Sequence, residues 1–197
     1  MRPTSLAPRA PKDLRRPAAA AALIAAAATH IAGCAAPTCI IGAALAAVTY
    51  RIMLIDLKLC VIDRRDIFCL SAVGIIDATI YSSDFLKDLL CSITSSASFV
   101  AILILVQRAY RQVRHVDGIG SGDIELVAAE GFLLGVDDVA ASLWLGAVLT
   151  LGFVLLRLAH RPSRRVSRMR APYGCFLAAA MLLIWLFRAM TTGRALS

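Results

Sequence analysis

The sequence lacks the residue patterns of the common metal and nucleophile sites. None of the six cysteines is paired in a CxxC motif, so we expect no zinc site and no disulfide framework. The three histidines form no recognisable set with serine and aspartate, which argues against a Ser-His-Asp hydrolase. At 197 residues, the chain also has no room for a large soluble domain beside its apolar blocks.

Acidic residues are in the minority, with 13 Asp and Glu against 21 Lys and Arg, a net charge of +8. A basic protein often binds nucleic acid. In this chain, however, the basic residues lie between apolar blocks, as in membrane proteins, so we expect no nucleic-acid partner. Hydrophobic residues make up 59% of the chain, above the roughly 45–50% of soluble domains. The sequence therefore predicts an all-α, polytopic integral membrane protein.

The chain divides into four parts. Residues 1–16 are predicted to form a basic cytosolic tail, and residues 17–37 an Ala-rich signal segment or extra transmembrane helix. Residues 38–190 form the predicted membrane domain, and residues 191–197 a short tail. Cys34 ends an Ile-Ala-Gly-Cys stretch that resembles a lipoprotein cleavage site, although a chance match in an Ala/Gly-rich region is the favoured interpretation.

Five apolar blocks in the membrane domain are long enough to cross a bilayer. A shorter amphipathic block over 122–136 contains acids that could not face lipid, so we expect a helix packed among the others. With it, the domain has about six core transmembrane helices. The five longer blocks are 38–56, 67–83, 91–107, 139–156 and 173–190.

The distribution of basic residues predicts the orientation. Seventeen of the 21 Lys and Arg lie in residues 2–16, 57–66, 108–117 and 157–170, which the positive-inside rule places in the cytosol. Arg51 lies outside these segments, and we expect its side chain to snorkel to the cytosolic headgroups.

Acids inside membrane spans are costly and need a reason. Asp56 ends the first long block and Asp123 opens the amphipathic block, so the predicted topology places both carboxyls at the cytosolic face. Two such carboxyls, one protonated and one ionised, could activate a water molecule while polarising a substrate carbonyl. Alternatively, each acid merely ends a helix near water. Asp77, deep in the next span, is interpreted as a structural polar contact with a neighbouring Ser or Thr.

The residues around Asp123 support the catalytic interpretation. The stretch from Gly118 to Gly135, which reads GIGSGDIELVAAEGFLLG, resembles the GxGD signature of type IV prepilin peptidases. Gly120 and Gly122 precede the acid and let the backbone approach closely. Gly131 and Gly135 are four residues apart, the spacing of a tight helix-packing face.

Two other segments resemble the same family. DLKLCVIDR, which begins at Asp56, has the spacing of the family's first catalytic motif, and PYGCFL, over 172–177, is similar to the entry of its last helix. Together the resemblance covers about residues 38–190.

The sequence departs from the family pattern at two positions and contains a further unusual acid. Asp63 stands where the family has proline, and Glu125 where it has lysine. We expect Glu125 to adjust the site without being catalytic. Glu130 lies two helical turns after Asp123 on roughly the same face, where it could line a shared polar path, pair with an Arg, or be a buried neutral acid.

The resemblance implies an aspartic endopeptidase with catalytic Asp56 and Asp123, supported by Gly120, Gly122, Glu125 and Glu130, and needing no metal or cofactor. Because it lacks CxxC pairs, the chain resembles the short, peptidase-only form of the family that is found with Flp/Tad pilus systems. The implied substrates are prepilins or pseudopilins, cut at the cytosolic face of the bacterial inner membrane.

Two alternatives stay open. The chain could be a catalytically degenerate membrane partner in pilus or secretion assembly, a reading that Asp63 and Glu125 motivate. It could also be a presenilin-like GxGD protease that cuts within transmembrane helices, but Ile55-Asp56 does not match the Tyr-Asp pair usual in that group.

Overall fold

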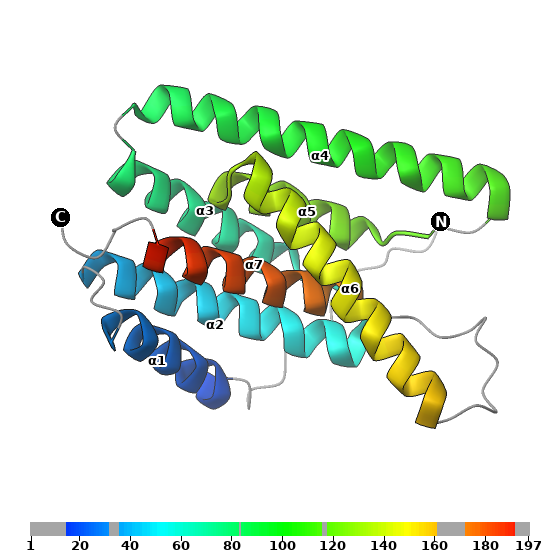
Figure 1. Cartoon of the computed structure of the whole chain (residues 1–197), viewed down its shortest axis with the longest axis horizontal. Helices are drawn as coiled ribbons and strands as arrows, with labels where there is room; N and C mark the ends of the chain where they lie inside the picture. Colours follow the sequence, from blue (N-terminus) through cyan, green and yellow to red (C-terminus); the bar gives the residue numbers. More distant parts are fainter. Residues whose placement is uncertain (1–14, 32–35, 83, 116–117, 161–171, 192–197) are drawn as a thin grey trace, which may run out of the picture.

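The structure is a computed structural model that describes residues 15–31, 36–82, 84–115, 118–160 and 172–191. This part of the chain folds into seven α-helices and is otherwise made of short connections (Figure 1). The helices are α1 (Arg15–Ile31), α2 (Ala36–Leu59), α3 (Arg64–Tyr81), α4 (Phe85–Arg114), α5 (Ser121–Leu133), α6 (Val136–His160) and α7 (Tyr173–Thr191).

Four of the described helices, α2, α4, α6 and α7, are long and apolar enough to cross a membrane. The predicted all-α, polytopic membrane fold is therefore confirmed. Helix α5, at 13 residues, extends about 20 Å and is too short to cross the roughly 30 Å hydrocarbon core alone. It packs against α3, α4 and α7, as expected for a helix that carries acids and cannot face lipid.

The helices surround a core built mainly by α2, α5 and α7. Leu45, Leu126, Val127, Met181 and Trp185 belong to it and are fully buried. Figure 1 shows α4 along one side of this core and α1 along the other, while α6 crosses α7 obliquely. Much of α4 and α6 presents exposed apolar side chains, which suits contact with lipid chains.

The Ala-rich segment forms α1, which packs along α2. Thr29 of α1 is fully buried, and its Cγ2 methyl lies 3.5 Å from the position that a Cβ would take on Gly42. The same Cβ would lie 3.1 Å from the Trp185 ring, so a side chain at position 42 would require the ring to shift by a few tenths of an ångström. Cys34 lies outside the described residues, as do residues 1–14 of the predicted tail 1–16 and residues 192–197 of the predicted tail 191–197, while residues 15–16 belong to α1 and residue 191 ends α7.

The predicted glycine face of α5 is correct at one position and wrong at the other. A Cβ on Gly131 would lie 2.6 Å from the Ser96 Cα of α4, so Gly131 permits close approach of the two helices. The Ser96 hydroxyl also donates to the Ala128 carbonyl at 2.8 Å. A Cβ on Gly135 would meet nothing within 4 Å, because α5 ends at Leu133 and position 135 lies beyond the packed helix.

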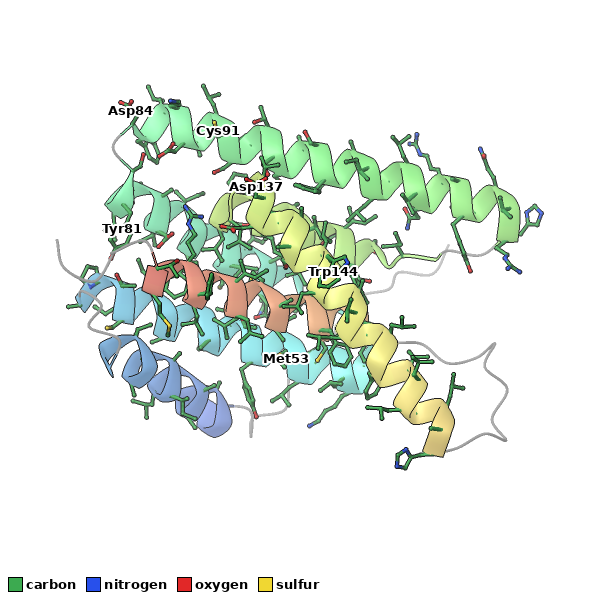
Figure 2. The ribbon with its side chains drawn as sticks, viewed as in Figure 1. Met53, Tyr81, Asp84, Cys91, Asp137 and Trp144 are labelled. Atoms are coloured by element: carbon green, nitrogen blue, oxygen red, sulfur yellow. The ribbon has the colours of Figure 1, made fainter. Side chains whose placement is uncertain are left out.

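The helix bundle has two ends, which are distinguished by the helices that begin and end at each. Helices α2 and α4 end, and α3, α5 and α7 begin, toward the end where residues 60–63 connect α2 to α3, which we call the 60–63 end. Figure 2 shows Tyr81 and Asp84 at the opposite end. The groups that concern the chemistry below lie at the 60–63 end.

Candidate active site

Asp56 faces the interior because it continues the buried stripe of α2. Ile41, Leu45 and Ile52 are buried at helical spacing, and Asp56 follows on the same face with 4% of its surface exposed. Its Oδ2 atom accepts a hydrogen bond from the backbone N–H of Cys175 at 2.7 Å. Cys175 lies in the first turn of α7, where backbone N–H groups have no partner within the helix. The start of α7 thus supplies a donor that favours negative charge on Asp56.

Asp123 lies on the buried face of α5. Leu126, Val127 and Glu130 follow it at three, four and seven residues, and all three are buried. Asp123 is in the first turn of this helix, and its backbone N–H donates to the Gly120 carbonyl at 3.2 Å. Its Oδ2 atom lies 3.1 Å from the position that a Cβ would take on Gly120. A larger residue at position 120 would therefore press on the carboxyl.

The two carboxyls meet beside Gly174, at the start of α7. A Cβ on Gly174 would lie 3.0 Å from Asp123 Oδ1 and 3.2 Å from Asp56 Oδ2. The two oxygens are therefore at most 6.2 Å apart, which is the sum of these distances. A water molecule that donates or accepts hydrogen bonds of about 2.8 Å on both sides spans up to about 5.6 Å. The upper limit of 6.2 Å is therefore compatible with one bridging water between the two carboxyls.

Ile62 packs along one side of this gap. Its Cδ1 atom lies 2.7 Å from the Cβ position of Gly174, and its Cβ lies 3.2 Å from that of Gly122. Two glycines, one on α5 and one on α7, thus admit one isoleucine from the 60–63 connection. This contact explains why Gly122 is needed next to Asp123. The sequence indicated Gly122 through the GxGD pattern, whereas the roles of Gly174 and Ile62 were not predicted.

Gly174 was visible in the sequence only as part of the PYGCFL stretch. Gly174 is more than 50 positions from both aspartates in the sequence, and no residue near position 174 indicates that it lies beside their carboxyls. A signal existed in the buried face of α7, since Leu177, Ala178 and Met181 follow Gly174 at helical spacing. A glycine that opens such a face marks a point where another element approaches closely.

Glu125 lies apart from the aspartate pair. Its Oε1 atom is 3.5 Å from Arg64 Nη2, and its side chain is 40% exposed. A turn of 200° between positions 123 and 125 directs the two side chains to different faces of α5. The structure therefore places Glu125 at the rim of the 60–63 end, where its charge is partly neutralised by Arg64.

Glu130 is fully buried and points to α6. Its Oε2 atom accepts a hydrogen bond from the Ser142 hydroxyl at 3.1 Å, and its Oε1 atom has no hydrogen-bond partner among the described residues. Of the expected alternatives, pairing with an arginine is not observed in the described part of the chain. Glu130 links α5 to α6 two turns away from the Asp123 carboxyl.

Asp63, at the position where the family has proline, caps α3. Its side chain accepts from the backbone N–H of Arg65 at 3.1 Å, and its φ of −80° is close to the value that proline fixes. The guanidinium of Arg51 lies 3.1 Å from Asp66 Oδ1 and 3.6 Å from Asp63 Oδ2, so the side chain extends toward the 60–63 end, and its expected contact with headgroups stays a prediction. Asp66 is buried, and a buried carboxylate needs a charged or hydrogen-bonding partner of this kind.

Asp77 is buried in α3 and lies away from the aspartate pair. It lines a cavity of about 200 Å³ at the opposite end of the bundle, together with Tyr81, Ser82, Asp88 and Arg188. Apolar residues such as Phe132 and Leu134 complete the lining, so Asp77 is buried at a place where polar and apolar groups meet, which agrees with a structural role. The expected hydrogen bond to a Ser or Thr stays a prediction.

The fold and the site define a polytopic, all-α membrane protein with two inward-facing carboxyls at one end of its helix bundle. A model of the type IV leader peptidase family matches residues 43–156, which include both aspartates and more than half of the chain. The protein therefore belongs to the type IV leader peptidase family, and its type of activity is that of a prepilin peptidase. No curated protein and no solved structure matches the chain.

Proposed function

We propose that the protein is an aspartic endopeptidase that removes the leader peptide of Flp/Tad-like prepilins, with Asp56 and Asp123 as its catalytic residues. The observation that carries the proposal is the gap beside Gly174, where one oxygen from each carboxyl lies within 3.2 Å of a single point. Both residues fall in the segment that matches the family.

The two carboxyls would divide the chemistry between them. The N–H of Cys175 stabilises the anionic form of Asp56, so Asp56 accepts a proton from the bridging water. Asp123 carries a proton and donates it to the carbonyl oxygen of the scissile bond while the water oxygen attacks the carbon. When the resulting diol collapses, the proton on Asp56 passes to the leaving amine and Asp123 regains its own.

The location follows from the charge distribution. The end of α2, the start of α3 and the end of α4 carry the basic residues Lys58, Arg64 and Arg111, and they lie at the same end of the bundle as the aspartate pair. The positive-inside rule places this end at the cytosolic face of the bacterial inner membrane. A prepilin leader that precedes a hydrophobic segment would meet the site there. Reporter fusions after residues 62 and 113 should therefore read as cytosolic, and a fusion after residue 87 as external.

The alternative of an inactive assembly partner was motivated by Asp63 and Glu125. Asp63 acts as the helix cap of α3 and Glu125 pairs with Arg64, and neither interaction involves the Asp56 or Asp123 carboxyl. Their replacement of the family's proline and lysine thus gives no reason to expect an inactive site.

Asparagine substitution of each aspartate tests the proposal. Asp56→Asn and Asp123→Asn should each lower leader cleavage of a co-expressed Flp-like prepilin by at least about 10³-fold, because the pair acts as one unit. Cleavage is followed by mass spectrometry of the pilin N-terminus. Asp84→Asn, an exposed acid at the opposite end, is the matched control and should cleave normally.

Full processing by either variant, with the protein inserted at normal levels, would show that the pair is not catalytic. Absence of cleavage by the wild-type protein toward every Flp-like prepilin encoded nearby would favour the assembly-partner alternative.

A further inference from the structure

A groove of about 420 Å³ lies between α4 and α5 at the 60–63 end. Its lining combines apolar and charged groups from the last turns of α4 and the first turns of α5: Ile104, Gln107, Arg108, Arg111, Ile124 and Glu125. Ser121, the first residue of α5, also lines it. The proposed catalytic mechanism uses none of these side chains.

The length of α4 places the groove at headgroup level. Its 30 residues extend about 45 Å, whereas the hydrocarbon core is about 30 Å thick. The side chains of Leu105 and Val106 are at least half exposed. They form the last apolar stretch before the basic end of the helix. Arg108 and Arg111 therefore lie where apolar chains give way to phosphate groups.

The charge at the groove favours an anion. Two arginines line it, and the N-terminus of α5 opens beside them with no side-chain cap on its free N–H groups. Glu125 is the opposing charge among the residues that line the groove, and it lies 3.5 Å from Arg64. Ile104 and Ile124 give the groove an apolar wall that an acyl chain could follow.

We propose that this groove binds the phosphate group of an anionic phospholipid, with its acyl chain against Ile104 and Ile124. The site adjoins the catalytic loop, because the Gln107 side-chain amide donates to the Ile119 carbonyl at 2.7 Å. Ile119 lies directly before the Gly120 cap of α5. A lipid seated against Gln107 and Ser121 thus stabilises the loop that positions Asp123.

Lipid retention measured by native mass spectrometry tests the site independently of peptidase activity. The purified full-length protein is equilibrated in detergent with equal amounts of phosphatidylglycerol and phosphatidylcholine. We expect one phosphatidylglycerol to be retained preferentially. Arg108→Gln/Arg111→Gln should weaken this retention at least about tenfold, because charge-assisted hydrogen bonds to phosphate are lost.

The chain offers a matched control and an opposite change. Arg114→Gln removes the same charge one turn further along α4, outside the groove lining, and should retain the lipid as the wild type does. Glu125→Gln removes the opposing carboxylate and should strengthen retention. Circular dichroism and elution volume check that each variant is folded.

Several outcomes would overturn the proposal. Equal retention of the two lipids would indicate general adherence to the apolar surface. Equal losses in the Arg114 variant and the double variant would indicate a diffuse charge effect. Displacement of phosphatidylglycerol by millimolar inorganic phosphate would assign the groove to a free phosphate instead of a lipid.

Discussion

Replacing Gly174 with alanine perturbs the proposed active site at its narrowest point. The new methyl group would lie 3.0 Å from Asp123 Oδ1, 3.2 Å from Asp56 Oδ2 and 2.7 Å from Ile62 Cδ1. Both carboxyls would have to move by a few tenths of an ångström. The methyl group would also occupy the space proposed for the water, so it acts on catalysis without changing any catalytic residue.

The expected effect is large on the rate and small on stability. A displacement of reacting groups by about 1 Å costs on the order of 10²-fold in rate. The shift of a few tenths of an ångström costs less than this, so most of the expected loss comes from exclusion of the water. Overpacking costs about 1–3 kcal/mol of unfolding free energy. Alanine offsets part of that cost, since it is favoured over glycine in a helix by up to about 1 kcal/mol.

The assay compares leader cleavage and thermal unfolding of purified protein in the same detergent. Gly152→Ala is the matched control, because a Cβ at position 152 would meet nothing within 4 Å, and both measurements should stay near wild type. The double variant Gly174→Ala/Ile62→Val removes the Cδ1 atom that the methyl group approaches most closely. It should recover stability but not cleavage.

Two results would refute this reasoning. Cleavage by Gly174→Ala at more than about half the wild-type rate would mean that the reaction does not use the gap between the aspartates. Recovery of cleavage along with stability in the double variant would mean that the single change acts by disturbing the helix packing.

Two further predictions concern the stability of variants that introduce or remove a glycine. Cys60 adopts a φ of 50°, a left-handed conformation that glycine tolerates better than cysteine, and its backbone N–H donates to the Asp56 backbone carbonyl at 2.8 Å. Cys60→Gly should therefore raise the free energy of unfolding by about 0.5–1 kcal/mol. An unchanged or lower value in a denaturant titration would contradict this. Gly131→Ala should lower the free energy of unfolding by at least about 2 kcal/mol through a clash with Ser96. Gly135→Ala should change the free energy of unfolding by no more than about 0.5 kcal/mol. Equal effects would refute the assignment of Gly131 as the contact.

The positions of the helices could be predicted from sequence because apolar periodicity is a local property. The apolar blocks at 38–56 and 173–190 each lie within a described helix, α2 and α7. The block at 67–83 also became a helix, but it is not among the apolar span candidates in the described chain. The helix that contains it, α3, carries Asp66 and Asp77, and both are buried by neighbours, which only packing could provide.

The pairing of the aspartates was inferred from topology, and its details came from the fold. Charge counting placed Asp56 and Asp123 at one face of the membrane, since span order and the positive-inside rule depend on sequence alone. It could not indicate that the Cys175 N–H binds Asp56 or that Gly174 separates the two carboxyls. Those contacts join residues more than 50 positions apart, which no local pattern encodes.

The sequence by itself determined the class of fold and the positions of the long apolar helices, because both follow from residue type and spacing along the chain. Tertiary structure alone decided which partners these residues meet. Glu130 binds Ser142, Arg51 turns to Asp66, and a Cβ on Gly135 would meet no described atom within 4 Å. The physical reason is that helix packing is set by the combined shapes of several helices, and a side chain takes its partner from whichever neighbour that packing brings within reach.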